Sequence, residues 1–171
     1  QYMRTNWLLE YRGNPGWYGK VNDFVTQVNQ RQSQFDILTY KQSYVDDSTI
    51  SRFWNRAYTG PDISNLEQLE VAYPSKRFVY MTAAVAKLDQ AHITEWNTNM
   101  RNYATSTQRI LFDLADIETH RPNGSSCGTT MCAEYCIESA GGHLTNGMAQ
   151  QHVAKAWWVL MARLAEWQPN G

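Results

Sequence analysis

The sequence feature that most constrains the fold is an alternation of short apolar runs with longer amphipathic segments. Three runs rich in β-branched and aromatic residues, at 35–40, 77–82 and 109–114, have the composition and length of buried strands. Helical periodicity occupies the segments around and between them, at residues 20–31, 50–58, 63–73, 92–106 and 148–167. Strands that alternate with helices pair in parallel through crossover connections. The sequence therefore predicts an α/β fold, with a mainly parallel sheet in a three-layer α/β/α sandwich.

Composition limits both the size of the fold and the class of partner. The chain has 171 residues and 43% hydrophobic content, which is enough for a single domain over residues 1–171. Its net charge is −1 and no block of Lys and Arg stands out, so we expect no nucleic-acid partner. No run of about 18 apolar residues occurs, so we expect no membrane span.

Three cysteines, Cys127, Cys132 and Cys136, fall close together in the last third of the chain. One disulfide with an unpaired third cysteine is the expected arrangement. A zinc site completed by His120 or His143 is the alternative, but the spacing contains no Cys-x-x-Cys pair. We therefore predict no metal and no other cofactor.

The sequence also indicates a cellular compartment. Asn123-Gly124-Ser125 is an N-glycosylation acceptor pattern, which places Asn123 in a surface loop of a secreted protein. The N-terminus lacks the pattern of a signal peptide, as a processed secreted chain would. With the clustered cysteines, these observations predict a secreted, extracellular glycoprotein.

The most informative local motif is Gly-Gly-His-Leu-Thr-Asn-Gly at residues 141–147, which places His143 on a short loop before the last predicted helix. A histidine held in this way can present a ring nitrogen to a cleft and act as a general base. A solvated turn residue is the commoner role for a histidine beside glycines. Asp116, Glu118 and His120 follow the third strand, at the sheet edge where ligands bind in parallel α/β folds. Helix capping is the alternative role for such carboxylates.

A glycine turn, two strands, two helical segments and the histidine loop follow one another in a distinctive order. They are Arg12-Gly13-Asn14-Pro15-Gly16, the strand 35–40 with the following Lys41-Gln42-Ser43-Tyr44-Val45-Asp46, the strand 78–82, Asn97-x-x-Met100-Arg101, Gly142-His143-Leu144-Thr145, and Ala154-Lys155-Ala156-Trp157-Trp158. Over most of the chain, this order resembles the later sequence blocks of the SGNH/GDSL hydrolase superfamily. The resemblance implies a flavodoxin-like sheet and ester hydrolysis by a serine, a glycine, an asparagine and a histidine.

The serine of that family is missing from its expected place. It should follow the first strand, upstream of the glycine block, yet the twelve residues before Gly13 contain no serine. By the same comparison, the first strand would lie in the middle of the sheet, between a strand leading to Gly13 and the strand ending at Tyr40. Backbone groups left unpaired there would cost roughly 1 to 3 kcal/mol each. We therefore expect the chain to be N-terminally incomplete, with this strand supplied by a longer precursor or by a second chain.

The resemblance implies His143 as the catalytic base. The acid of the family usually lies three residues earlier, where this chain has Ala140. Another carboxylate would therefore have to orient His143, and Asp116 or Glu118 at the end of the third strand is the candidate.

The implied donors to the oxyanion are the backbone N–H of Gly13 and the side chain of Gln42 or Ser43. The predicted function is that of an SGNH-like esterase acting on an extracellular ester such as an acetylated glycan, with the serine supplied from outside this chain. The alternative is a catalytically inactive structural or glycan-binding protein that assembles by strand donation.

Overall fold

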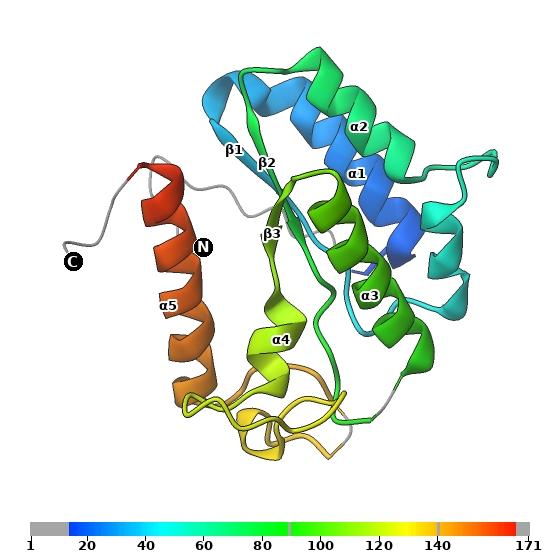
Figure 1. Ribbon diagram of the computed structural model, residues 1–171. Coiled ribbons are helices and arrows are strands. Elements are labelled where there is room, and N and C mark those ends of the chain that lie inside the picture. The colour runs from blue at the N-terminus through cyan, green and yellow to red at the C-terminus, as the bar shows by residue number, and fades with distance from the viewer. Residues whose placement is uncertain (1–13, 89, 140, 167–171) are drawn as a thin grey trace. The chain divides into compact units, whose positions relative to one another are not determined.

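The computed structural model describes residues 14–88, 90–139 and 141–166 (Figure 1). These residues fall into two compact units. Unit one contains residues 14–40 and 45–79, and unit two contains residues 41–44 together with the described residues from 80 onward. A single domain over residues 1–171 stays a prediction.

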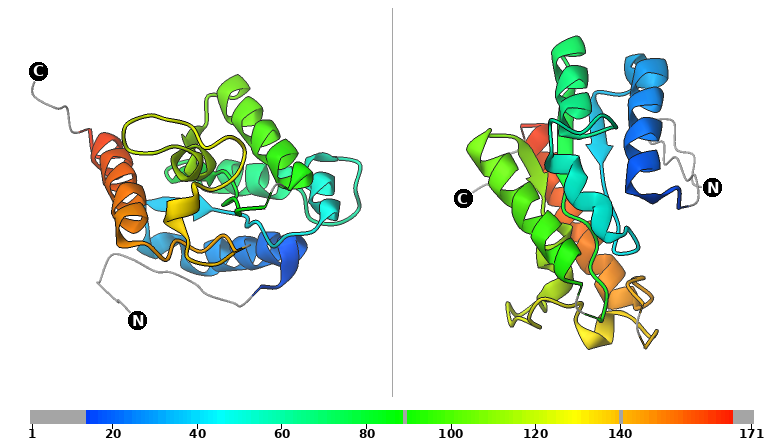
Figure 2. Two further views of the ribbon diagram at one scale, coloured as in Figure 1. Left: turned by 90° about the horizontal axis from the view of Figure 1, so that it is seen from below. Right: turned by 90° about the vertical axis from the view of Figure 1, so that its right-hand side faces the viewer.

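Unit one is built around two helices, α1 (Gly16–Arg31) and α2 (Ile63–Ala72), which lie side by side (Figures 1 and 2). Both helices present apolar residues at helical spacing to the unit's interior, which explains why they pack. The buried members are Trp17, Val21 and Val28 of α1 and Ile63, Leu66 and Leu69 of α2. Asp62 begins α2 with a capping box, since its carboxylate accepts from the Ser64 N–H while Asn65 Oδ1 accepts from the Asp62 N–H.

Three short strands form one parallel sheet in the order β1-β2-β3. They are β1 (Ile37–Tyr40), β2 (Arg77–Met81) and β3 (Ile110–Phe112). Parallel neighbours need long crossovers, and the chain provides α2 between β1 and β2 and α3 (Ala91–Ser106) between β2 and β3. The predicted α/β class is confirmed.

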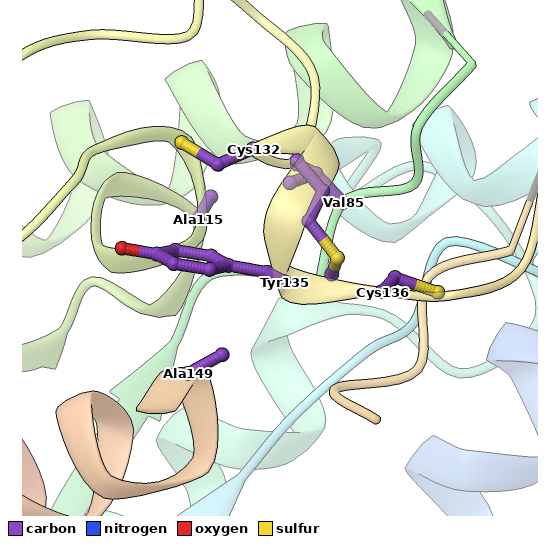
Figure 3. Close-up of a cluster of buried hydrophobic side chains, with 7 residues drawn as sticks. Val85, Ala115, Cys132, Tyr135, Cys136 and Ala149 are labelled. Atoms are coloured by element: carbon purple, nitrogen blue, oxygen red, sulfur yellow. The ribbon is translucent and has the colours of Figure 1, made fainter. Parts of the chain in front are cut away.

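Unit two contains α3, α4 (Leu114–Thr119) and α5 (Gly147–Leu164), with a long loop between α4 and α5 (Figure 1). The loop folds back on α4 and the start of α5 around one buried cluster (Figure 3). Its members are Val85, Ala115, Met131, Cys132, Tyr135, Cys136 and Ala149. The ring of Tyr135, carried by a short 3-10 helix (Ala133–Tyr135), lies between Ala115 and Ala149 in this view. This cluster fixes the loop that carries the candidate site.

Two predicted segments differ from the structure. The strand predicted to reach residue 114 ends at Phe112, and a short helix, α4, replaces the start of the predicted loop. The cause is Asp113, whose carboxylate caps α4 by accepting from the Asp116 N–H. The segment predicted as a helix at 50–58 is instead a 3-10 helix over Ser48–Trp54, capped by Asp47.

The predicted arrangement of one disulfide and one unpaired cysteine is confirmed. Cys127 and Cys132 form a disulfide, whereas Cys136 is a buried free thiol. In Figure 3 the sulfur atoms of Cys132 and Cys136 point away from each other.

Within the described ranges, no group of three or more His, Cys, Asp or Glu side chains could hold a metal ion. Across the same residues, no helix has the length and apolar character needed to cross a bilayer.

The strand predicted to be missing from the sheet would pair with the edge of β1 that faces away from β2. In the described sheet β1 lies at one end of the strand order, next to β2. The strand predicted to lead to Gly13 falls outside the described residues. The missing central strand therefore stays a prediction.

Candidate functional site

His143 lies in the loop that enters α5. Asn146 caps this helix, because its side-chain oxygen accepts from the Met148 N–H at 2.8 Å. The Thr145 hydroxyl accepts from the Ile137 N–H at 2.8 Å and so ties the two arms of the loop together. The side chain of His143 is 69% exposed, so a proton can pass between its ring and a bound molecule without rearrangement of the core.

Glu138 is the carboxylate that contacts this histidine. Its two oxygens lie 3.0 and 3.1 Å from Nδ1 of His143. A carboxylate accepts hydrogen bonds, so this contact places the proton of a neutral ring on Nδ1 and leaves the lone pair on Nε2. A histidine oriented in this way by an acid is the general base of serine hydrolases.

Tyr44 is the second side chain in contact with this ring. Its Oη lies 3.3 Å from Nε2 and 3.4 Å from Nδ1 of His143, and the two rings meet edge to face with centroids 5.7 Å apart. Both oxygen–nitrogen distances exceed those of a strong hydrogen bond. Tyr44 therefore confines the imidazole mainly by ring packing, with its hydroxyl nearly equidistant from the two ring nitrogens.

The two glycines before His143 make room for both neighbours. A Cβ on Gly142 would lie 2.5 Å from the Tyr44 ring and 2.8 Å from the carbonyl oxygen of Val85. A Cβ on Gly141 would overlap the carboxylate of Glu138. The Gly-Gly-His sequence thus has a physical reason: any larger residue at either position displaces a group that contacts His143.

Asp116 and Glu118, the two carboxylates predicted to orient His143, contact other groups instead. Asp116 contacts His120, with 3.3 Å between Oδ1 and Nδ1. Glu118 is buried and accepts from the Val85 N–H at 2.8 Å, and burial raises the pKa of its carboxyl to about 8. Gln42 is buried with 1% of its surface exposed. Gly13 lies outside the described residues.

Sequence reasoning missed Glu138 and Tyr44. It looked for the acid three residues before His143, whereas Glu138 lies five residues before it. The signal that could have identified Glu138 is the Gly-Gly pair, because a Cβ at Gly141 would overlap the Glu138 carboxylate. Cys136 lies next to the Glu138–His143 pair, with its Sγ 3.8 Å from Oε2 of Glu138.

Two hollows lie away from this group of side chains. A shallow one of about 330 Å³ runs along α2 in unit one and is lined by Ser64, Glu67, Gln68, Val71 and Ala72. It comes from a single helix and brings no reactive groups together. A smaller cavity of about 230 Å³ lies in unit two, beside His120.

Comparisons with protein-family models, with curated proteins and with solved structures found no match.

Proposed function

We propose that this chain carries the base of an SGNH-like ester hydrolase, with His143 as general base and Glu138 as the acid that orients it. The observation that carries the proposal is the contact of Nδ1 with the Glu138 carboxylate, which leaves the Nε2 lone pair on an exposed ring. Proton transfer by a positioned histidine contributes about 10²- to 10⁴-fold to such reactions.

The reaction is acyl transfer from an ester to water. A serine supplied from outside this chain attacks the ester carbonyl, and His143 Nε2 takes the proton from its hydroxyl. The imidazolium, stabilised by Glu138, then donates this proton to the departing alcohol. Water attacks the acyl-serine with His143 again as base, which releases the acid and restores the serine. The N–H of Gly13 and the Gln42 side chain are the proposed donors to the oxyanion in both steps.

The proposal includes an architecture and a compartment. The architecture is a mainly parallel three-layer α/β/α sandwich, completed by a central strand from a longer precursor or a second chain. The compartment is extracellular, with an acetylated glycan as the ester substrate. The disulfide and the exposed Asn123 in its acceptor sequence support secretion.

A second function is a structural or glycan-binding role without catalysis. The observation that favours it is the position of β1 at one end of the described strand order, since an open edge can accept a strand from a neighbouring subunit. Light scattering distinguishes this case, because strand exchange produces an assembly, whereas a stable monomer argues against donation.

The test of the hydrolase is turnover of p-nitrophenyl acetate by the purified native protein and by His143→Ala. We expect the variant to lose at least a hundredfold in kcat/KM. The matched control is His92→Ala, which removes a histidine of α3 and should keep the native rate. A correctly folded native protein that shows no turnover, or a His143→Ala variant with native turnover, contradicts the proposal.

A further inference from the structure

The smaller cavity has the position of a ligand site in a parallel α/β fold. It has a volume of about 230 Å³ and lies beyond the carboxyl ends of β2 and β3. Val85 follows β2 in the chain, and Asp116 and His120 follow β3. Ligands of open parallel sheets bind at this end of the strands. The lining contains neither His143 nor Glu138, so the cavity is chemically separate from the proposed hydrolase site.

His120 contributes a hydrogen-bond acceptor to this cavity, because a backbone contact determines the tautomer of its ring. Its Nδ1 lies 2.9 Å from the carbonyl oxygen of Asp116. A carbonyl oxygen only accepts, so Nδ1 must carry the proton, and Nε2 of the neutral ring keeps its lone pair. The carboxylate of Asp116, 62% exposed, adds a second acceptor to the same cavity wall.

Arg101 and Thr94, both on α3, supply the donors. The Nε and Nη2 atoms of Arg101 bond to the Asp113 carboxylate at 2.6 and 2.9 Å. This bonding raises the pKa of the guanidinium further, so the group stays charged. Its remaining N–H groups make no hydrogen bond within the described part of the chain and are available to a ligand in the cavity. Thr94 adds a hydroxyl that can donate or accept.

The charge of the cavity selects among ligand classes. An anion would meet the Asp116 carboxylate, while the positive charge of Arg101 is already balanced by Asp113. A cation would meet the Arg101 guanidinium. A neutral hydroxyl both donates and accepts, so adjacent hydroxyls can satisfy Arg101 on one side and Asp116 or His120 on the other.

We propose that this cavity binds one neutral, hydroxyl-rich ring of the size of a monosaccharide. Pockets for drug-sized molecules measure roughly 300 to 1,000 Å³. This cavity, at about 230 Å³, is smaller, which fits a ligand of a single ring. Val85 and Ala115 provide the apolar floor against which the face of such a ring would pack. The proposal stands whether or not the chain hydrolyses esters, since none of its residues contacts His143.

The test is saturation-transfer NMR on the full chain with D-xylose, D-glucose and N-acetyl-D-glucosamine, and with sodium acetate as an anionic probe. We expect transfer to at least one of the sugars and none to acetate. Asp116→Ala removes a charged acceptor and should weaken sugar binding about tenfold, and Thr94→Val should weaken it about threefold.

Matched controls separate the cavity from the rest of the molecule. Thr105→Val and Glu95→Ala make the same chemical changes at exposed positions of α3 outside the lining, and should bind like the native protein. His143→Ala should also retain sugar binding. The proposal is overturned if none of the three sugars binds, if acetate binds instead, or if Thr94→Val and Asp116→Ala, checked for native circular dichroism, bind as tightly as the controls.

Discussion

Unit two contains two histidine–carboxylate pairs that are held in opposite ways. His143 and Glu138 come from an irregular loop, both are substantially exposed, and a side-chain carboxylate alone sets the tautomer of the ring. His120 and Asp116 are one helical turn apart, and a backbone carbonyl sets the tautomer of His120. The first pair depends on contacts between side chains of a loop, whereas the second lies at the end of α4 and is held by its backbone.

The difference separates proton transfer from recognition. A general base must gain and lose a proton on each turnover, so solvent access and a carboxylate that stabilises the imidazolium suit His143. A binding group must keep one hydrogen-bonding pattern, so a backbone-fixed tautomer suits His120. The His120 side chain is also less exposed than that of His143, 36% against 69%, and the Tyr135 hydroxyl donates to the His120 carbonyl at 2.7 Å.

The largest expected effect concerns Glu118, the buried acid beside the second pair. Its pKa is about 8 in the folded protein, against an ordinary value of 4.5, because burial penalises the charged form. A raised folded pKa means that the stability linked to this proton is fully present below the ordinary value and is lost as pH rises towards 8. The native protein should therefore lose on the order of 4 kcal/mol of unfolding free energy over this range.

Glu118→Gln should remove most of that decline, since an amide keeps an acceptor for the Val85 N–H without the titrating proton. The measurement is urea unfolding of both proteins at several pH values between 4.5 and 8. Glu95→Gln on the exposed surface of α3 is the control and should follow the native curve. Parallel curves for the native protein and Glu118→Gln would show that α4 is not anchored by a buried neutral acid.

The next largest effect concerns Glu138, the carboxylate in contact with His143. Glu138→Gln should lower kcat for ester hydrolysis about tenfold to a hundredfold, because an amide no longer stabilises the imidazolium. The loss should be smaller than for a buried acid, since water partly replaces an exposed carboxylate. An equal loss in Asp116→Asn would support the acid suggested by the sequence and contradict the pairing in the structure.

Much of the fold was predictable because it depends on local periodicity. The helices predicted at 63–73 and 92–106 match Ile63–Ala72 and Ala91–Ser106 within one residue at each end. The predicted strand at 77–82 matches Arg77–Met81 equally well. By contrast, α4 has only six residues, too few for a periodic signal, and it begins where Asp113 is placed by its bonds to Arg101 and Thr82.

The candidate site was only partly predictable for the same reason. His143 stands out because glycines surround it and a long amphipathic helix follows it. Glu138 lies five residues before His143 and Tyr44 lies 99 residues before it, and neither contact follows a regular sequence spacing. The pairing of Asp116 with His120 was not predictable, because it depends on α4, which the sequence did not predict.

The smallest expected effect is the difference in stability between removing the hydroxyl of Tyr135, which contacts His120, and that of Tyr44, which contacts His143. Tyr135 is 1% exposed, and its hydroxyl bonds to the His120 carbonyl, so Tyr135→Phe leaves a partly buried acceptor without its partner. We expect a loss of about 1 to 2 kcal/mol in unfolding free energy. The Tyr44 hydroxyl makes only long contacts with the exposed His143, so Tyr44→Phe should cost less than about 0.5 kcal/mol. Urea midpoints at constant slope measure both losses. Equal losses would mean that the His143 region is anchored as firmly as α4, and the contrast between the two pairs would then fail.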